Sequence, residues 1–330
     1  MARIFLTHVP HMLQNYYGER AVAALRTLGD VTINPGTDLL DAKALFEASK
    51  GCDIIVSDRQ TPGPAAFFEM GPDAAAFLRC AVDIRNIDVP AASRQGILVT
   101  HATPGFIASV AEQTIGMVVD CARNVSEYVG TYRKGEIPAP RAGRQLKGST
   151  LGIMGYGEIG RYLAPLGVAL GMTVLISDPF KTVEDPTLKQ VDLPALLKES
   201  DFVVCLVVAN EKTESLMNAE AFAQMKPGAF FINMSRGNLV DEGALIRALD
   251  RKIIAGAAMD VGRAQDQMPS LELARRKDVI ATPHSAGLTP QAIEHQAFDT
   301  VNQVAELVAG RMPPGAANPD AATRLHRFRT

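Results

Sequence analysis

The feature that most constrains this chain is a glycine-rich turn between a short apolar run and a helical stretch. Leu151–Met154 is apolar enough to form a buried strand, and Gly155–Gly160 has the sequence GYGEIG. Ile159–Leu170 then has the composition of a helix, and Thr173–Ser177 that of a second strand. A G-x-G-x-x-G string is weak evidence alone, but between a strand and a helix it is typical of a dinucleotide-binding βαβ unit.

Each glycine of this turn has its own predicted role. Gly155 permits the tight turn, Gly157 lets the backbone approach a pyrophosphate, and Gly160 lets the helix pack closely on the strand. The N-terminus of the helix offers free N–H groups and the positive end of its dipole to the phosphates.

Asp178 ends the second strand of this unit, 18 residues after Gly160. A carboxylate there accepts hydrogen bonds from the adenosine ribose hydroxyls and repels a 2′-phosphate, which favours NAD over NADP. Lys181 nearby weakens that exclusion. In the alternative interpretation, Asp178 only starts a turn before Pro179.

The rest of the chain alternates short apolar runs with helical stretches, which predicts an α/β fold with doubly wound parallel sheets. The amphipathic helix expected at Thr289–Gly310 can cross back onto the N-terminal unit, which would make that domain discontinuous. Further strands are predicted at Ala2–Leu6, Val31–Ile33, Asp53–Ser57, Gly96–Thr100, Phe202–Val207, Ala229–Asn233, Gly256–Asp260 and Val279–Thr282. Further helices are predicted at Ala21–Leu28, Ser109–Arg123 and Glu242–Asp250.

Composition excludes several other classes of protein. A length of 330 residues suggests about two domains. The net charge of −3 argues against a nucleic-acid partner. No apolar run approaches the ~20 residues of a membrane span, and no signal peptide is predicted. The four cysteines are far apart, which predicts no metal site and suggests the cytoplasm.

Three later segments follow predicted strands, where an open α/β sheet borders its ligand crevice. They are Asn233–Gly237, the residues after Asp260, and Thr282–Gly287. Arg236 can hold a carboxylate in a fork of hydrogen bonds, and His284 can transfer a proton near neutral pH. Singly, each residue is more simply structural, but their joint position after the dinucleotide motif favours a catalytic site.

With these motifs in this order, the chain resembles the D-isomer-specific 2-hydroxyacid dehydrogenase family (phosphoglycerate dehydrogenase-like) over nearly its whole length. The resemblance implies a Rossmann NAD-binding domain at 99–288 and a smaller, flavodoxin-like substrate domain at 1–98 plus 289–330. It also implies a homodimer formed through Ser109–Arg123. The matching segments are Asn86–Asp88, Ser109–Glu112, Leu151–Gly160, Asn233–Leu245, Asp260–Val261 and Thr282–His284.

The same resemblance implies hydride transfer between nicotinamide and C2 of a 2-hydroxy or 2-keto acid. Arg236 would bind the substrate carboxylate, and His284 would be the acid in reduction and the base in oxidation. Asp260 and the Met234 carbonyl would hold the nicotinamide carboxamide. The expected cofactor residues are Gly155, Gly157, Glu158, Ile159, Gly160, Asp178, Met234, Asp260 and Gly287, with the Glu158 and Ile159 N–H groups on the pyrophosphate.

Gln265 is the first departure from the family pattern. Most members have a Glu five residues after the Asp that corresponds to Asp260, and that Glu pairs with the His. A neutral amide can orient His284 but cannot stabilise its positive charge, so His284 should hold its proton less firmly than in those relatives. Asp266 would take this part if the loop register slips by one residue.

The other departures concern the expected substrate residues Arg59, Val82, Asp83 and Phe106. Asp83 replaces a glycine of the family, so either it pairs with Arg85 or the substrate is larger or less anionic than lactate. Phe106 stands where many relatives have a substrate-binding Asn. His8–Tyr17 either lines the site or forms a surface loop.

Two alternative functions follow from these departures. Gln265 and Asp83 together suggest, as one alternative, a non-catalytic NAD(H)-binding scaffold that is similar to the corepressors of this fold. A glutamine at position 265 also resembles the pattern of the formate dehydrogenase branch, whose reaction needs no proton transfer. Phe106 argues against that branch, because its members have the substrate-binding Asn.

Overall fold

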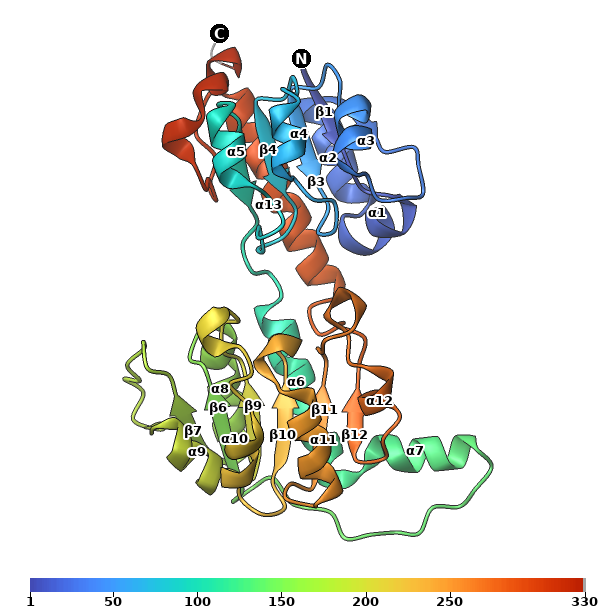
Figure 1. The fold of residues 1–330 in the computed structure, drawn as a ribbon, viewed down its shortest axis with the longest axis vertical. Helices are drawn as coiled ribbons and strands as arrows, with labels where there is room; N and C mark the ends of the chain where they lie inside the picture. The colour runs from blue at the N-terminus through green and yellow to red at the C-terminus, as the bar shows by residue number, and fades with distance from the viewer. Residues whose placement is uncertain (329–330) are drawn as a thin grey trace. The chain divides into compact units, whose positions relative to one another are not determined.

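The computed structural model describes residues 1–328 and divides into two compact units (Figure 1). The first unit combines Met1–Phe106 with the chain from Leu288 onward, and the second is Ile107–Gly287. The first boundary therefore falls after Phe106 and not after residue 98, because strand β5 (Leu98–His101) pairs with the sheet of the first unit. The last two residues of the predicted 289–330 segment lie outside the described chain.

The first unit is a five-stranded parallel sheet in the order β2-β1-β3-β4-β5. This order is the flavodoxin-like doubly wound topology, as predicted. Its strands are short, and those at the centre of the sheet are buried because helices cover both faces. The other strands are β1 (Ala2–Leu6), β2 (Gly29–Ile33), β3 (Ile54–Ser57) and β4 (Ala76–Arg79), and the helices are α1 (Pro10–Tyr16), α2 (Glu19–Leu28), α3 (Ala42–Ala48), α4 (Ala65–Glu69), α5 (Val89–Arg94) and α13 (Pro290–Val308).

Helix α13 completes the core of the first unit from the far end of the sequence. Its buried residues Ala297, Val301, Val304 and Leu307 belong to one apolar cluster with side chains of β1, β3, β4 and α2. The first unit is therefore discontinuous, as the amphipathic pattern at its C-terminal helix predicts.

The second unit is a seven-stranded parallel sheet in the order β12-β11-β10-β9-β6-β7-β8. Chain order reverses between β6 and β9, which is the Rossmann arrangement with its ligand crevice at the strand carboxyl ends. The strands are β6 (Thr150–Met154), β7 (Thr173–Ser177), β8 (Lys189–Gln190), β9 (Phe202–Cys205), β10 (Phe230–Asn233), β11 (Gly256–Met259) and β12 (Val279–Ala281). The helices are α6 (Ile107–Arg123), α7 (Val125–Arg133), α8 (Glu158–Ala169), α9 (Leu193–Glu199), α10 (Ala219–Gln224), α11 (Glu242–Asp250) and α12 (Leu271–Ala274).

The segment His8–Tyr17 is not a surface loop, so that interpretation of the sequence is wrong. Pro10 begins helix α1, and His8, Met12 and Tyr17 are buried in the first unit. Proline at the first turn suits a helix start, because that N–H has no intrahelical partner.

Within residues 1–328, no helix is long and apolar enough to cross a membrane. Within the same range, no three His, Cys, Asp or Glu side chains are grouped as they would be to hold a metal ion.

Candidate active site

The glycine turn after β6 has the shape that a pyrophosphate site needs. Gly155 has φ +96°, and a Cβ on Gly160 would lie 2.4 Å from the Gly155 carbonyl oxygen, so both positions require glycine. A Cβ on Gly157 would instead meet open space. Gly157 is the N-cap of α8 and has no side chain to cap the helix. It therefore does not accept hydrogen bonds from the first N–H groups of the helix, those of Glu158 and Ile159. The turn fits a dinucleotide phosphate.

Asp178 stands directly after β7, beside this turn. Its Oδ2 accepts a hydrogen bond from the Tyr156 N–H at 2.8 Å, and its Oδ1 accepts one from the Phe180 N–H at 2.8 Å. A carboxylate oxygen accepts more than one hydrogen bond, so both oxygens keep capacity for ribose hydroxyls. The carboxylate therefore stabilises the local turn and keeps lone pairs for further hydrogen bonds.

The loop that carries Arg236 is built around the buried amide of Asn233. This amide donates to the Arg236 carbonyl at 3.0 Å and accepts from the Ser235 N–H at 3.1 Å. The Ser235 hydroxyl donates to the Val207 carbonyl at 2.6 Å, which ties the loop to the end of β9. Arg236 is half-buried and Met234 is buried, so the loop holds the guanidinium at the strand end.

Two glycines pack the Arg236 loop against the loop after β11. A Cβ on Gly237 would lie 2.0 Å from the Gly262 carbonyl carbon, and one on Gly262 would lie 2.5 Å from the Pro269 Cα. Real Cβ atoms essentially never approach so closely, so the two loops touch only because residue 237 is glycine, while Gly262 is required by the close approach of Pro269 in its own loop. This contact brings Arg236 near the segment that carries Gln265.

His284 follows β12 with φ +52°, a conformation that few non-glycine residues adopt. Its Nδ1 lies 2.7 Å from the main-chain carbonyl oxygen of Asp266. A carbonyl only accepts, so Nδ1 carries the hydrogen and Nε2 is the nitrogen left for proton transfer. His284 Nδ1 therefore contacts the main chain of Asp266, while the side chain of Gln265, the expected partner, is exposed. Gly287 ends the second unit three residues later.

Asp260 is 2% exposed and holds the loop around His284. Its Oδ1 accepts from the Thr282 hydroxyl at 2.5 Å and from the Ser285 N–H at 3.0 Å, and its Oδ2 accepts from the Ala286 N–H at 3.0 Å. The Gln113 amide of α6 donates to the same Oδ1 at 3.2 Å. Sequence reasoning missed Gln113, because no local pattern relates it to a carboxylate 147 residues away.

In the first unit, buried Arg79 connects the loops after β3 and β4. Its guanidinium donates to the main-chain carbonyls of Asp58, Arg59, Thr61 and Asp83. Burial lowers the pKa of Arg79 to about 10, against the opposing effect of the Asp58 carboxylate. This one side chain fixes the backbone at two of the predicted substrate residues, Arg59 and Asp83.

The Asp83 carboxylate pairs with Arg85, which confirms one of the two alternatives from the sequence. The guanidinium donates to its two oxygens at 3.0 and 2.6 Å. The guanidinium of Arg59 lies 4.8 Å from the Tyr16 ring centroid, as a cation–π pair. Val82 is half-buried beside the Asp83–Arg85 pair, and half-buried Phe106 is the last residue before the second unit.

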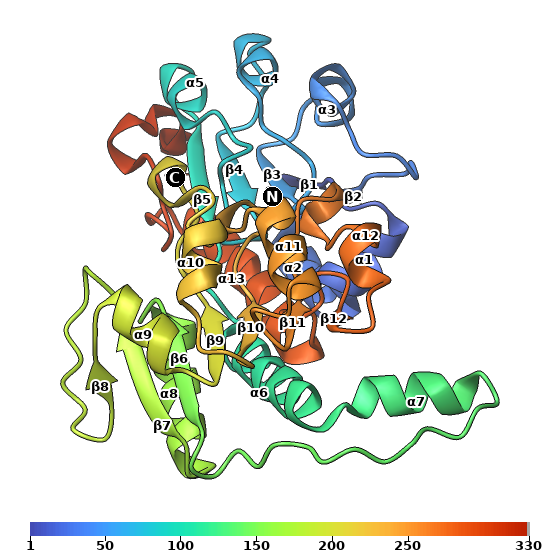
Figure 2. The ribbon, with the colours of Figure 1, turned by 60° about the horizontal axis from the view of Figure 1, so that its bottom comes forward.

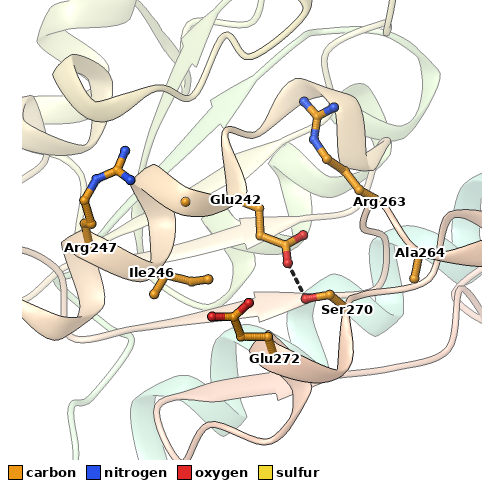
Figure 3. A pocket seen from close by; sticks show the side chains of 8 residues that line it. Glu242, Ile246, Arg247, Arg263, Ala264, Ser270 and Glu272 are labelled. Atoms are coloured by element: carbon orange, nitrogen blue, oxygen red, sulfur yellow. Dashed lines mark hydrogen bonds between the residues drawn. The ribbon is translucent and has the colours of Figure 1, made fainter.

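A separate groove of about 570 Å³ lies behind the loop after β11 (Figure 3). Figure 3 shows Arg247 and Arg263 at opposite sides, with the Glu242 and Glu272 carboxylates between them. Glu242 accepts a hydrogen bond from the Ser270 hydroxyl. The groove includes no residue of the predicted site, so its size does not identify the active site.

Comparison with known proteins gives one family. Residues 115–286 match the NAD-binding domain of the D-isomer specific 2-hydroxyacid dehydrogenases. The chain is 33% identical over 313 residues to D-3-phosphoglycerate dehydrogenase of Synechocystis, covering 92% of this chain and 56% of that relative. It thus spans little more than half of that protein.

Two further relatives extend over nearly their whole length. The chain is 34% identical over 301 residues to (S)-sulfolactate dehydrogenase of Chromohalobacter salexigens, covering 89% of this chain and 96% of the relative. A crystal structure of a protein from Thermus thermophilus superposes with a TM-score of 0.85 at 28% identity, over 96% of this chain and 99% of that one. The chain belongs to the D-isomer-specific 2-hydroxyacid dehydrogenase family, and its cofactor is NAD.

Proposed function

We propose that the chain transfers a hydride between nicotinamide and C2 of a 2-hydroxy or 2-keto acid. The supporting observation is that Arg236, Asp260 and His284 follow three neighbouring parallel strands, β10, β11 and β12. The carboxyl ends of these strands share one edge of the sheet, where α/β folds bind ligands. The glycine contact between Gly237 and Gly262 then draws two of the three loops together.

The proposed chemistry needs a cation and one proton carrier from the protein. NADH, when bound, would supply the hydride that reduces C2 of the keto acid. The Arg236 guanidinium binds the substrate carboxylate and stabilises the charge that develops on the 2-oxygen. His284 Nε2 donates the proton to that oxygen, and in oxidation it takes the proton back. The Asp266 carbonyl keeps the ring in the required orientation.

The proposed cofactor contacts follow from the same strand edge. The N–H groups of Glu158 and Ile159 bind the pyrophosphate across the open space at Gly157, and Asp178 binds the ribose. The Met234 carbonyl and Asp260 bind the carboxamide. Asp260 Oδ2 accepts the Ala286 N–H and keeps a lone pair for this bond.

For the substrate, we propose contacts from Arg59, Val82 and Phe106. Asp83 is neutralised by Arg85, so it gives no reason to expect a less anionic substrate than the family uses. Phe106 in place of an Asn favours an apolar group beyond C2. Together these residues favour a keto acid with a bulky side chain.

The test is NADH oxidation with 2-keto acids from glyoxylate to phenylpyruvate, and NAD reduction with 3-phosphoglycerate, sulfolactate and formate. Arg236→Gln should lower kcat/KM at least about 100-fold, as loss of a charged transition-state contact does, with NADH binding kept. Arg247→Gln, in the groove behind the site, is the matched control and should keep full activity. NADH binding without turnover would support the non-catalytic scaffold, and turnover of formate alone would support the formate-type enzyme.

We also propose a homodimer formed through α6, with α7 covering the partner. Figure 2 shows α7 extending away from the sheet of its own unit, and none of its residues is buried. Val125, Val129 and Tyr132 on α7 and Ile137 beyond it are exposed apolar side chains, which a second copy would cover. Light scattering of the purified chain should give twice the 35.3 kDa mass, and a monomer would contradict the proposal.

We also propose a cytoplasmic location. The four free, buried cysteines support it.

A further inference from the structure

We infer that Gln113 of helix α6 is a positioning residue for the proposed reaction, acting on His284 through Asp260 and Thr282. The inference rests on the proposed function. The Gln113 Nε2 lies 3.2 Å from Asp260 Oδ1 and 3.0 Å from the Thr282 hydroxyl. These two groups stand at the carboxyl ends of neighbouring strands, and one amide joins them.

The loop that Gln113 supports holds a strained residue. His284 has φ +52°, and its N–H donates to the Asp260 carbonyl at 2.9 Å. The next two N–H groups, of Ser285 and Ala286, donate to the Asp260 carboxylate. Such a conformation is unfavourable and persists only where its surroundings fix it. The Asp260 carboxylate is that fixing point, so whatever orients the carboxylate orients the ring.

The hydrogen-bond roles in this cluster require two donors at position 113. The Thr282 hydroxyl donates its single hydrogen to Asp260 Oδ1, so towards Gln113 it accepts. The Asp260 carboxylate also accepts only. A primary amide supplies two N–H groups on one nitrogen and matches both acceptors. Glutamate at this place, when ionised, would instead bring a second carboxylate against Asp260, and methionine would supply no donor.

These requirements predict different effects of two nearly isosteric substitutions. Gln113→Met should lower kcat for keto-acid reduction about tenfold, with the KM for the keto acid and the Kd for NADH each within threefold of the wild type. Gln113→Glu should be active only at low pH, where its carboxyl is protonated, and should lose activity as pH rises. Glu112→Gln, at the exposed neighbouring position on α6, is the control and should show neither effect.

A second measurement keeps the inference independent of turnover. In spectra of the full chain labelled with ¹⁵N-histidine, the His284→Gln variant identifies the His284 ring signals. The wild type should show a hydrogen on Nδ1, and Gln113→Met should shift or broaden these signals. If the wild type turns over no substrate, the proposed function fails, while this spectrum still tests Gln113.

Three results would overturn the inference. The first is a Gln113→Met variant with wild-type kcat and an unchanged His284 spectrum. The second is a loss of thermal stability alone, with kcat and the pH profile unaltered, which would make Gln113 merely structural. The third is a loss of NADH binding, which would assign Gln113 to the cofactor site.

Discussion

At the scale of single residues, His8 is a buried group whose charge state affects the stability of the fold. It follows β1, is fully buried, and has no hydrogen-bond partner on either ring nitrogen among residues 1–328. Its ring centroid lies 4.8 Å from that of Tyr17. Burial lowers the pKa of His8 to about 4, despite attraction from the Asp58 carboxylate and with added repulsion from Arg79. The folded chain therefore holds His8 neutral.

This predicts that His8 makes the folded state less stable in acid. An unfolded His8 takes up a proton near pH 6.5, and the folded one only near pH 4. Its contribution to stability is present above pH 6.5 and is lost as pH falls towards 4, by about 3 kcal/mol. Denaturant unfolding should show that the free energy of unfolding falls less between pH 7.5 and pH 4.5 for His8→Phe than for the wild type. His11→Phe, at an exposed position, is the control, and equal differences in all three chains would refute the prediction.

Gln265 gives a second prediction at this scale. Gln265→Glu would add a negative charge to the loop that holds His284, so the ring should stay protonated to higher pH. The pH at which keto-acid reduction falls to half should rise, by less than about one unit because the exposed carboxylate is screened by water. Rate profiles from pH 5 to 9 measure it, with the exposed Gln267→Glu as a charge control. An unchanged profile would place position 265 outside the range of His284.

At the scale of elements, the glycines of the turn before α8 separate binding from folding. Gly157→Ala should leave the melting temperature unchanged, because its Cβ meets open space, but should weaken NADH binding about tenfold or more. Gly160→Ala should lower the melting temperature by several degrees, because its Cβ would lie 2.4 Å from the Gly155 carbonyl oxygen. Calorimetry and NADH titration of both variants measure the contrast. Equal melting temperatures for the two would show that α8 shifts to accommodate either side chain.

The sequence predicts best those elements that are defined by local patterns. Thr173–Ser177 and Glu242–Asp250 match the structure at both ends, because an apolar run and a capped amphipathic stretch are visible in the residues themselves. Strand β4 was missed because it is short and ends in Arg79, a charge that only distant carbonyls make tolerable when buried. Helix α1 was missed because its polar residues face outward and its burial depends on α13.

The candidate site divides in the same way. The residues that chemistry demands, Arg236 and His284, are visible in the sequence, because a guanidinium and an imidazole after strands have few alternatives once a dinucleotide turn is found. Their supports are not visible. The partner of His284 is a main-chain carbonyl, which every residue type has. Gln113 comes close to Asp260 only when the chain folds. Neither contact can therefore be predicted from the type of residue.

At the scale of the whole molecule, the chain enters the second unit once and leaves it once, so 107–287 is continuous while the first unit is not. The apolar cluster around β9 and β10 lies wholly within the second unit. The segment 107–287 should therefore fold alone and bind NADH. Fluorescence titration of the isolated segment measures this, and failure to bind would mean that its fold depends on the first unit.

The first unit should not fold stably in a chain that stops at residue 287. That chain lacks the buried α13 side chains Val301, Val304 and Leu307, whose burial contributes at least about 5 kcal/mol. It also lacks the Thr300 hydroxyl that bonds the buried Tyr17 hydroxyl at 2.9 Å. Because about 5 kcal/mol approaches the whole stability of a domain, amides of β1 should exchange freely while those of β6 stay protected. Protection that persists in β1 would mean that the sheet closes its core without α13.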